Sequence, residues 1–84
     1  MDRLGPLFYP FMSGSKVVIR WNIDHPFYEK ILVSKKEDKT FVTAVDFIIY
    51  SMASAELKCK SDETVSLFED IRSYMSTNLR VLLD

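Results

Sequence analysis

Residues 41–59 contain neither glycine nor proline, and they are apolar on most sides of the helix that they would form. Apolar residues recur there at intervals of three and four, which predicts a helix. Asp46 is one of the few polar residues in this segment. A helix with so little polar surface needs cover on more than one side. Its main apolar stripe consists of Phe41, Val45, Ile48, Met52, Ala55 and Cys59, and it is widened by Val42, Ile49 and Ala53.

The chain is short for the amount of apolar side chain that it carries. Its 84 residues suffice for a single domain, residues 1–84, and 48% of them are hydrophobic. That fraction is normal for larger proteins, which have more interior to hold it. We therefore predict that a second molecule covers part of the apolar surface.

A second helix is predicted over residues 63–83, with Asp62 or Ser61 as its N-terminal cap. The connection before it is short, so the two helices should form a long antiparallel helical hairpin. The pattern predicts one core-facing stripe and places Ser76 on the opposite, polar side. That stripe consists of Val65, Phe68, Ile71, Met75, Leu79 and Leu82.

Residues 16–23 alternate between apolar and polar positions, which predicts a half-buried strand. A strand needs a hydrogen-bonded neighbour. Two candidates are open: the aromatic arm, residues 1–14, folded back at Ser13–Gly14, or an equivalent strand of a second chain. The arm packs either on its own chain or on another subunit. The apolar side of the strand holds Val17, Ile19, Trp21 and Ile23, and the polar side holds Lys16, Arg20 and Asn22.

His25 and Pro26 mark a structural corner after this strand. A residue before proline prefers extended geometry, whereas proline suits the first turn of a helix. We predict a short helix over residues 26–33, with a second strand over residues 30–34 as the competing interpretation. Thr40 is the expected N-terminal cap of the helix over residues 41–59.

These elements predict a small α+β protein with one strand or a short β-hairpin, a short helix and a long helical hairpin, completed by oligomerisation. The helix over residues 41–59 should lie in the interface, and a homodimer is the favoured assembly. The residues expected at this interface are Trp21, Phe41, Val45, Ile48, Ile49, Met52, Phe68, Ile71, Met75 and Leu79.

The sequence offers little for catalysis. With only two glycines it has no phosphate-binding loop, and nothing places its one cysteine, Cys59, beside its one histidine, His25. We therefore expect no enzyme, no cofactor and no metal site. An active site shared between subunits around His25 and Asp46 is the one catalytic alternative.

Charge and hydropathy exclude several partners. With 11 Lys and Arg against 12 Asp and Glu, no strong field attracts nucleic acid, and we do not expect nucleic-acid binding. The longest apolar stretch, residues 41–57, contains Asp46 and falls short of the roughly 20 residues that cross a bilayer. The start of the chain has no uninterrupted apolar signal segment. We expect a cytoplasmic protein without a membrane partner.

Three segments resemble a known family: Asn-x-x-His-Pro-Phe-Tyr at residues 22–28, Ala-Glu-Leu at residues 55–57, and the last helix at residues 68–83. They are similar to the C-terminal segment of ATP-binding proteins of the GHKL superfamily, named for gyrase, Hsp90, histidine kinase and MutL. The resemblance covers about residues 16–84, and the ATP-binding boxes of that superfamily are missing. It implies a detached or truncated tail module that serves dimerisation or partner docking.

The predicted function is accordingly a non-catalytic module for self-association or protein interaction. The alternative is a small regulator or inhibitor that binds a different, larger protein through the aromatic arm and the helix over residues 41–59.

Overall fold

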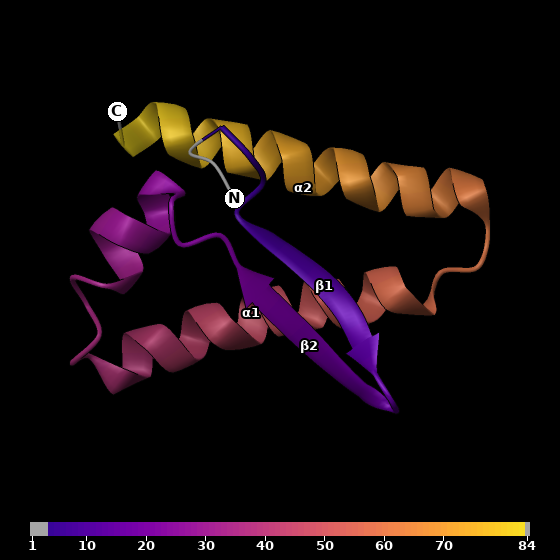
Figure 1. Cartoon of the computed structure of the whole chain (residues 1–84), viewed down its shortest axis with the longest axis horizontal. Coiled ribbons are helices and arrows are strands. Elements are labelled where there is room, and N and C mark those ends of the chain that lie inside the picture. The colour runs from indigo at the N-terminus through magenta and orange to yellow at the C-terminus, as the bar shows by residue number, and fades with distance from the viewer. Residues whose placement is uncertain (1–3, 84) are drawn as a thin grey trace.

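The computed structural model describes residues 4–83, which form an α+β fold (Figure 1). A β-hairpin of β1 (Phe8–Ser13) and β2 (Lys16–Trp21) is followed by a π-helix, η1 (Tyr28–Leu32). Two long helices, α1 (Lys39–Lys58) and α2 (Asp62–Leu83), then form a helical hairpin. The predicted α+β class with a β-hairpin, a short helix and a helical hairpin is confirmed, and its completion by oligomerisation stays a prediction. The first three residues of the predicted arm lie outside the described residues.

The arm pairs with the strand of its own chain. β1 and β2 are antiparallel and in register from Ser13 opposite Lys16 to Phe8 opposite Trp21. Gly14 has a φ of 62°, whereas Ser15 does not have a positive φ, which is the pattern of a type II′ turn. This turn matches the twist of the two strands, and it decides between the two pairing partners in favour of the arm.

Pro10 fits in this hairpin without losing a hydrogen bond. It lies opposite Ile19, and hydrogen-bonded and non-hydrogen-bonded pairs alternate along an antiparallel ladder. Counting from the bond that the Asn22 amide donates to the Leu7 carbonyl, at 2.8 Å, Pro10 occupies a non-hydrogen-bonded position. The missing N–H of proline therefore faces away from β2.

The predicted strand over residues 16–23 is two residues too long. β2 ends at Trp21, and Ile23 is 64% exposed although it was assigned to the apolar side. Asn22 was assigned to the polar side, yet it is fully buried. Its side chain donates to the Pro6 carbonyl at 2.9 Å and accepts from the Asp24 amide at 3.1 Å, so it turns the chain out of the sheet.

His25 and Pro26 form the corner that follows, and both are buried. The Glu29 amide donates to the His25 carbonyl at 3.1 Å, which begins the short helix at Pro26. The helix widens to a π turn where the Val33 amide donates to the Tyr28 carbonyl at 3.0 Å. The short helix is confirmed, and the competing strand over residues 30–34 is wrong.

The long helices begin at polar caps. The Asp38 carboxylate accepts from the Phe41 amide at 3.0 Å, so Asp38 caps α1 and the predicted cap Thr40 lies inside the helix. The carboxylate also suits the positive end of the helix dipole better than a hydroxyl does. The Ser61 hydroxyl accepts from the Thr64 amide at 3.2 Å, so Ser61 is the N-terminal cap of α2. Of the two predicted caps, Asp62 and Ser61, the second is therefore confirmed.

A small core lies where the hairpin meets both helices. Its fully buried centre comprises Leu7, Phe8 and Ile49. Trp21 packs beside this centre, 6.3 Å from the Phe8 ring and 5.9 Å from the Tyr28 ring between centroids. The half-buried side chains packed around the centre are Ile19, Trp21, Phe27, Tyr28, Val45, Met75 and Leu79.

The orientation of α2 differs from the predicted one. Ser76, expected on the polar side, is 2% exposed, whereas Ile71 is 41% and Leu82 is 76% exposed. The Ser76 hydroxyl accepts from the Leu7 amide at 2.8 Å and donates to the Arg72 carbonyl at 2.7 Å. The His25 ring also forms a hydrogen bond with the Ser76 carbonyl. Together these bonds hold the Ser76 side of α2 against the segments that flank the β-hairpin.

Replacement of Ser76 by alanine should destabilise the fold. Ser76→Ala leaves the buried Leu7 amide without its acceptor, which lowers the free energy of unfolding by about 1–3 kcal/mol. Urea denaturation at fixed protein concentration measures the change. Ser66→Ala, on the exposed side of α2, is the matched control. Equal effects of the two substitutions would contradict the assigned role of Ser76.

Gly14→Ala tests the turn. A Cβ at Gly14 meets no atom within 4 Å, so the substitution carries only the conformational cost of a positive φ. That cost is about 1–2 kcal/mol of unfolding free energy. Ser15→Ala, one position along, should change it by less than about 0.5 kcal/mol. A Gly14→Ala protein as stable as the wild type would exclude the type II′ turn.

Candidate functional site

Large apolar side chains are exposed on both long helices. Their exposed fractions range from 41% at Ile71 to 76% at Leu82. We call this surface the outer helical face. It comprises Phe47 and Ile48 of α1 and Leu67, Ile71, Tyr74, Val81 and Leu82 of α2.

These side chains are exposed because the hairpin covers only one side of each helix. On α1 the buried residues Ile49 and Ala53 mark the covered side. At about 100° per residue, Phe47 lies about 160° around the helix from Ile49, and Ile48 about 100°. On α2 Tyr74 lies about 160° from the buried Ser76. On α2 the outer helical face is therefore turned away from the covered side, whereas on α1 Phe47 also borders β2, because it lines a groove with Ile19 and Trp21.

The dimensions of the chain agree with an incompletely covered fold. Its accessible surface is 5834 Å², whereas about 5,200 Å² is typical of a monomer of 9.8 kDa. Its radius of gyration is 13.1 Å, against about 12 Å expected for this length. The excess of surface over that typical value is roughly 600 Å².

The structure separates the residues predicted at an interface into different environments. Ile48 and Ile71 are exposed on the outer helical face, whereas Ile49 is 4% exposed and belongs to the core of its own chain. Ile49 is therefore unavailable to a partner. The remaining predicted residues are half-buried. Four of them pack against the core: Trp21, Val45, Met75 and Leu79. The other three, Phe41, Met52 and Phe68, do not belong to the core cluster.

Sequence reasoning missed part of the outer helical face. The predicted interface residues do not include Phe47, Leu67, Tyr74, Val81 and Leu82. A signal for the α2 residues was present, because Leu67, Ile71, Tyr74, Asn78 and Val81 are spaced by four, three, four and three residues. This is the heptad spacing of a helix-pairing seam. It runs beside the predicted core-facing stripe and shares Ile71 with it, so the stronger stripe obscured it.

A groove lies between β2 and α1, beside the outer helical face. Its volume is about 520 Å³, and its only charged lining residue is Asp46. Asp46 and Trp21 also border a neighbouring cavity of about 330 Å³, which extends to η1 and Lys36. The residues lining the groove are Ile19, Trp21, Asp46, Phe47 and Tyr50.

His25 and Asp46, the residues of the alternative with a shared active site, do not line a common cavity in this chain. Both ring nitrogens of His25 contact backbone: Nδ1 accepts from the Phe27 amide at 3.1 Å, and Nε2 therefore carries the hydrogen and donates to the Ser76 carbonyl at 2.7 Å. Asp46 instead borders the two cavities next to Trp21, and His25 lines neither of them. Within residues 4–83, no group of three or more His, Cys, Asp and Glu side chains is placed to hold a metal ion.

By length and composition, α1 could cross a membrane. The expectation that the apolar stretch is too short is corrected, because the helix begins at Lys39 and has 20 residues. Only 11% of its most apolar 18-residue window is buried, whereas the core helix of a soluble protein is mostly buried. Most of α1 is therefore left uncovered by the described part of the chain.

Comparison with known proteins identifies no relative: no protein-family model, no curated protein and no solved structure matches the chain. The resemblance to the tail of GHKL proteins stays a prediction.

Two neighbouring isoleucines test the division between core and outer face. Ile49→Ala should lower the free energy of unfolding by about 2–5 kcal/mol, because it opens a cavity in the core. Ile48→Ala should lower it by no more than about 0.5 kcal/mol in dilute solution, because that side chain is 62% exposed. Chemical denaturation at low protein concentration measures both. Similar losses of unfolding free energy for the two variants would mean that α1 is rotated differently about its own axis.

Proposed function

We propose that this chain is a non-catalytic interaction module that forms a homodimer through the outer helical face. The observation that carries this proposal is the exposure of large apolar side chains on both long helices. Large apolar side chains exposed in this number are characteristic of protein–protein contacts.

The area of the uncovered surface supports a dimer. Stable interfaces bury about 800 Å² on each partner, which is close to the excess accessible surface of this chain. The formal net charge of −1 produces little repulsion between two copies.

The heptad spacing on α2 supports pairing between helices. Leu67, Ile71, Tyr74 and Val81 form an apolar seam, and Asn78 lies within it. A polar residue in such a seam favours one register, because other registers leave its amide without a partner. A two-fold axis would bring the same seam together from both chains.

In the cell, we propose a cytoplasmic module that acts like the tail of a larger ATP-binding protein and serves dimerisation or docking. The support is the resemblance of residues 22–28 and 68–83 to that tail. In the fold, these residues form the buried corner and most of α2.

The second candidate is a monomeric regulator that binds a different protein. Exposed apolar residues on β1 favour it, since Tyr9, Phe11 and Met12 are 39%, 44% and 48% exposed. The groove beside Trp21 would then receive part of the partner.

A lipid bilayer is a further possible cover for α1. Asp46 argues against it, because a carboxylate near the middle of a spanning helix is costly. Insertion would also remove Ile49 and Ala53 from their contacts with the rest of the fold.

Ile48→Asp tests the homodimer. The wild type should have twice the chain mass of 9.8 kDa in size-exclusion chromatography with light scattering. The substitution places an unpaired charge in the interface and should raise the dimer dissociation constant about 100-fold or more. Circular dichroism should show unchanged helix content, because Ile48 is not in the core.

Ile23→Asp is the matched control, because Ile23 is 64% exposed but lies outside the outer helical face. It should remain a dimer. A wild type that is monomeric at all concentrations would refute self-association and favour the regulator. A wild type that co-sediments with lipid vesicles would favour the bilayer. An Ile48→Asp protein that remains a dimer would exclude this face as the interface.

A further inference from the structure

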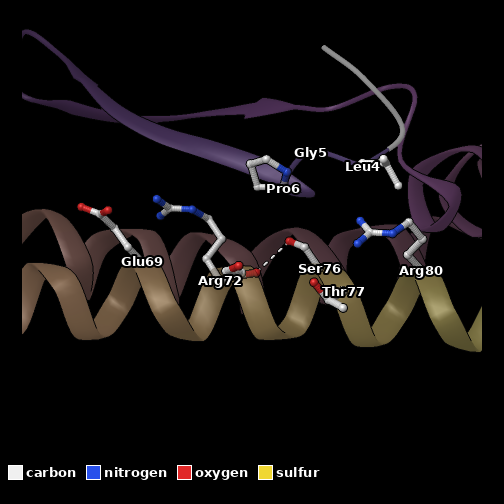
Figure 2. A pocket seen from close by; sticks show the side chains of 9 residues that line it. Leu4, Gly5, Pro6, Glu69, Arg72, Ser76, Thr77 and Arg80 are labelled. Carbon is white, nitrogen blue, oxygen red and sulfur yellow. Dashed lines mark hydrogen bonds between the residues drawn. The ribbon is translucent and has the colours of Figure 1, made fainter.

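A separate cavity lies between the segment before β1 and the inner side of α2 (Figure 2). Its volume is about 210 Å³. This is below the roughly 300–1,000 Å³ of pockets that enclose drug-sized ligands, so it suits a compact group. Its lining consists of Leu4, Gly5 and Pro6 on one side and Glu69, Arg72, Ser73, Ser76, Thr77 and Arg80 on the other.

Arg80, one of the lining residues, has an unsatisfied donor. Its Nη1 atom is buried, and no residue between 4 and 83 accepts a hydrogen bond from it. Buried guanidinium N–H groups are nearly always paired, because an unpaired one has lost its hydration without compensation. The position therefore calls for an acceptor that the described part of the chain does not supply.

The other arginine of the cavity is already held in place. Arg72 Nη1 pairs with the Glu56 carboxylate, and its guanidinium lies 5.8 Å from the centre of the Phe8 ring. In Figure 2 the Arg72 and Arg80 side chains rise from α2 on either side of Ser76, toward the segment that holds Pro6. The two guanidinium groups thus line the same cavity, and only that of Arg72 has an acidic partner among residues 4–83.

The remaining lining residues favour an anion at the Arg80 end. Ser73 and Thr77 add hydroxyl groups to the wall, whereas the Ser76 hydroxyl is already committed to Leu7 and Arg72. Glu69 is the one acid of the lining, and it lies about 16 Å along the helix axis from Arg80 at 1.5 Å per residue. Its repulsion of an anion bound beside Arg80 is therefore weak.

We propose that this cavity binds a compact oxyanion, a phosphate or a carboxylate group, on Arg80 and the Thr77 hydroxyl. A guanidinium group presents parallel N–H donors to two oxygens of such an anion, and these charge-assisted hydrogen bonds are stronger than neutral ones. The site is independent of the proposed dimer, because it lies on the inner side of α2.

Titration of the full chain with inorganic phosphate at constant ionic strength and pH 7 tests the site. We expect saturable amide chemical-shift changes in residues 73–80 and at Gly5, recorded by two-dimensional nitrogen–proton spectra. A parallel titration with acetate distinguishes a phosphate from a carboxylate as the preferred group. Arg80→Met should weaken binding at least about tenfold, because it removes the charge-assisted bonds and keeps the length of the side chain.

Arg20→Met is the matched control, because it removes the same charge from the exposed face of β2. It should leave the titration unchanged. Thr77→Val keeps both arginines, should fold normally because Thr77 is exposed, and should weaken binding several-fold. The proposal is overturned if the wild type shows no saturable shifts, if the shifts map outside this cavity, or if Arg20→Met and Arg80→Met reduce them equally. Water alone would then satisfy Arg80.

Discussion

Ser76 of α2 joins parts of the chain that lie far apart in the sequence. Its hydroxyl accepts from the Leu7 amide, and its carbonyl accepts from the His25 ring. Leu7 leads into the hairpin and His25 leads out of it, so both ends of the hairpin are attached to one turn of α2. In a core with so few buried side chains, leaving any of these groups unpaired would cost a large part of the stability.

This attachment decides where the apolar surface lies. With the hairpin held on Ser76, its inner face reaches Ile49 of α1, and the core forms between them. A hairpin of two six-residue strands covers only one side of two helices of 20 and 22 residues. The opposite side of the helices is left apolar and exposed, and the proposed dimer follows from that geometry rather than from any single motif.

Much of the fold could be predicted because its signals are local. The turn at Gly14, the alternation through Trp21, the proline after His25 and the long helical periodicity each depend on neighbouring residues. The ends of elements were less predictable. Asn22 fits an alternating strand as well as a buried turn, and its bond to the Pro6 carbonyl is what places it in the turn.

By itself the sequence determined the two long helices and the strand before His25, and that α1 is apolar on most of its sides. Only the tertiary structure decided which sides of the helices face inward. On α1 several sides are apolar, so periodicity does not distinguish Ile48 from Ile49. On α2 the heptad seam competes with the core stripe, and hydrogen bonds from distant residues turn Ser76 inward. The rotation of a helix about its axis depends on contacts between segments remote in sequence, which no local pattern records.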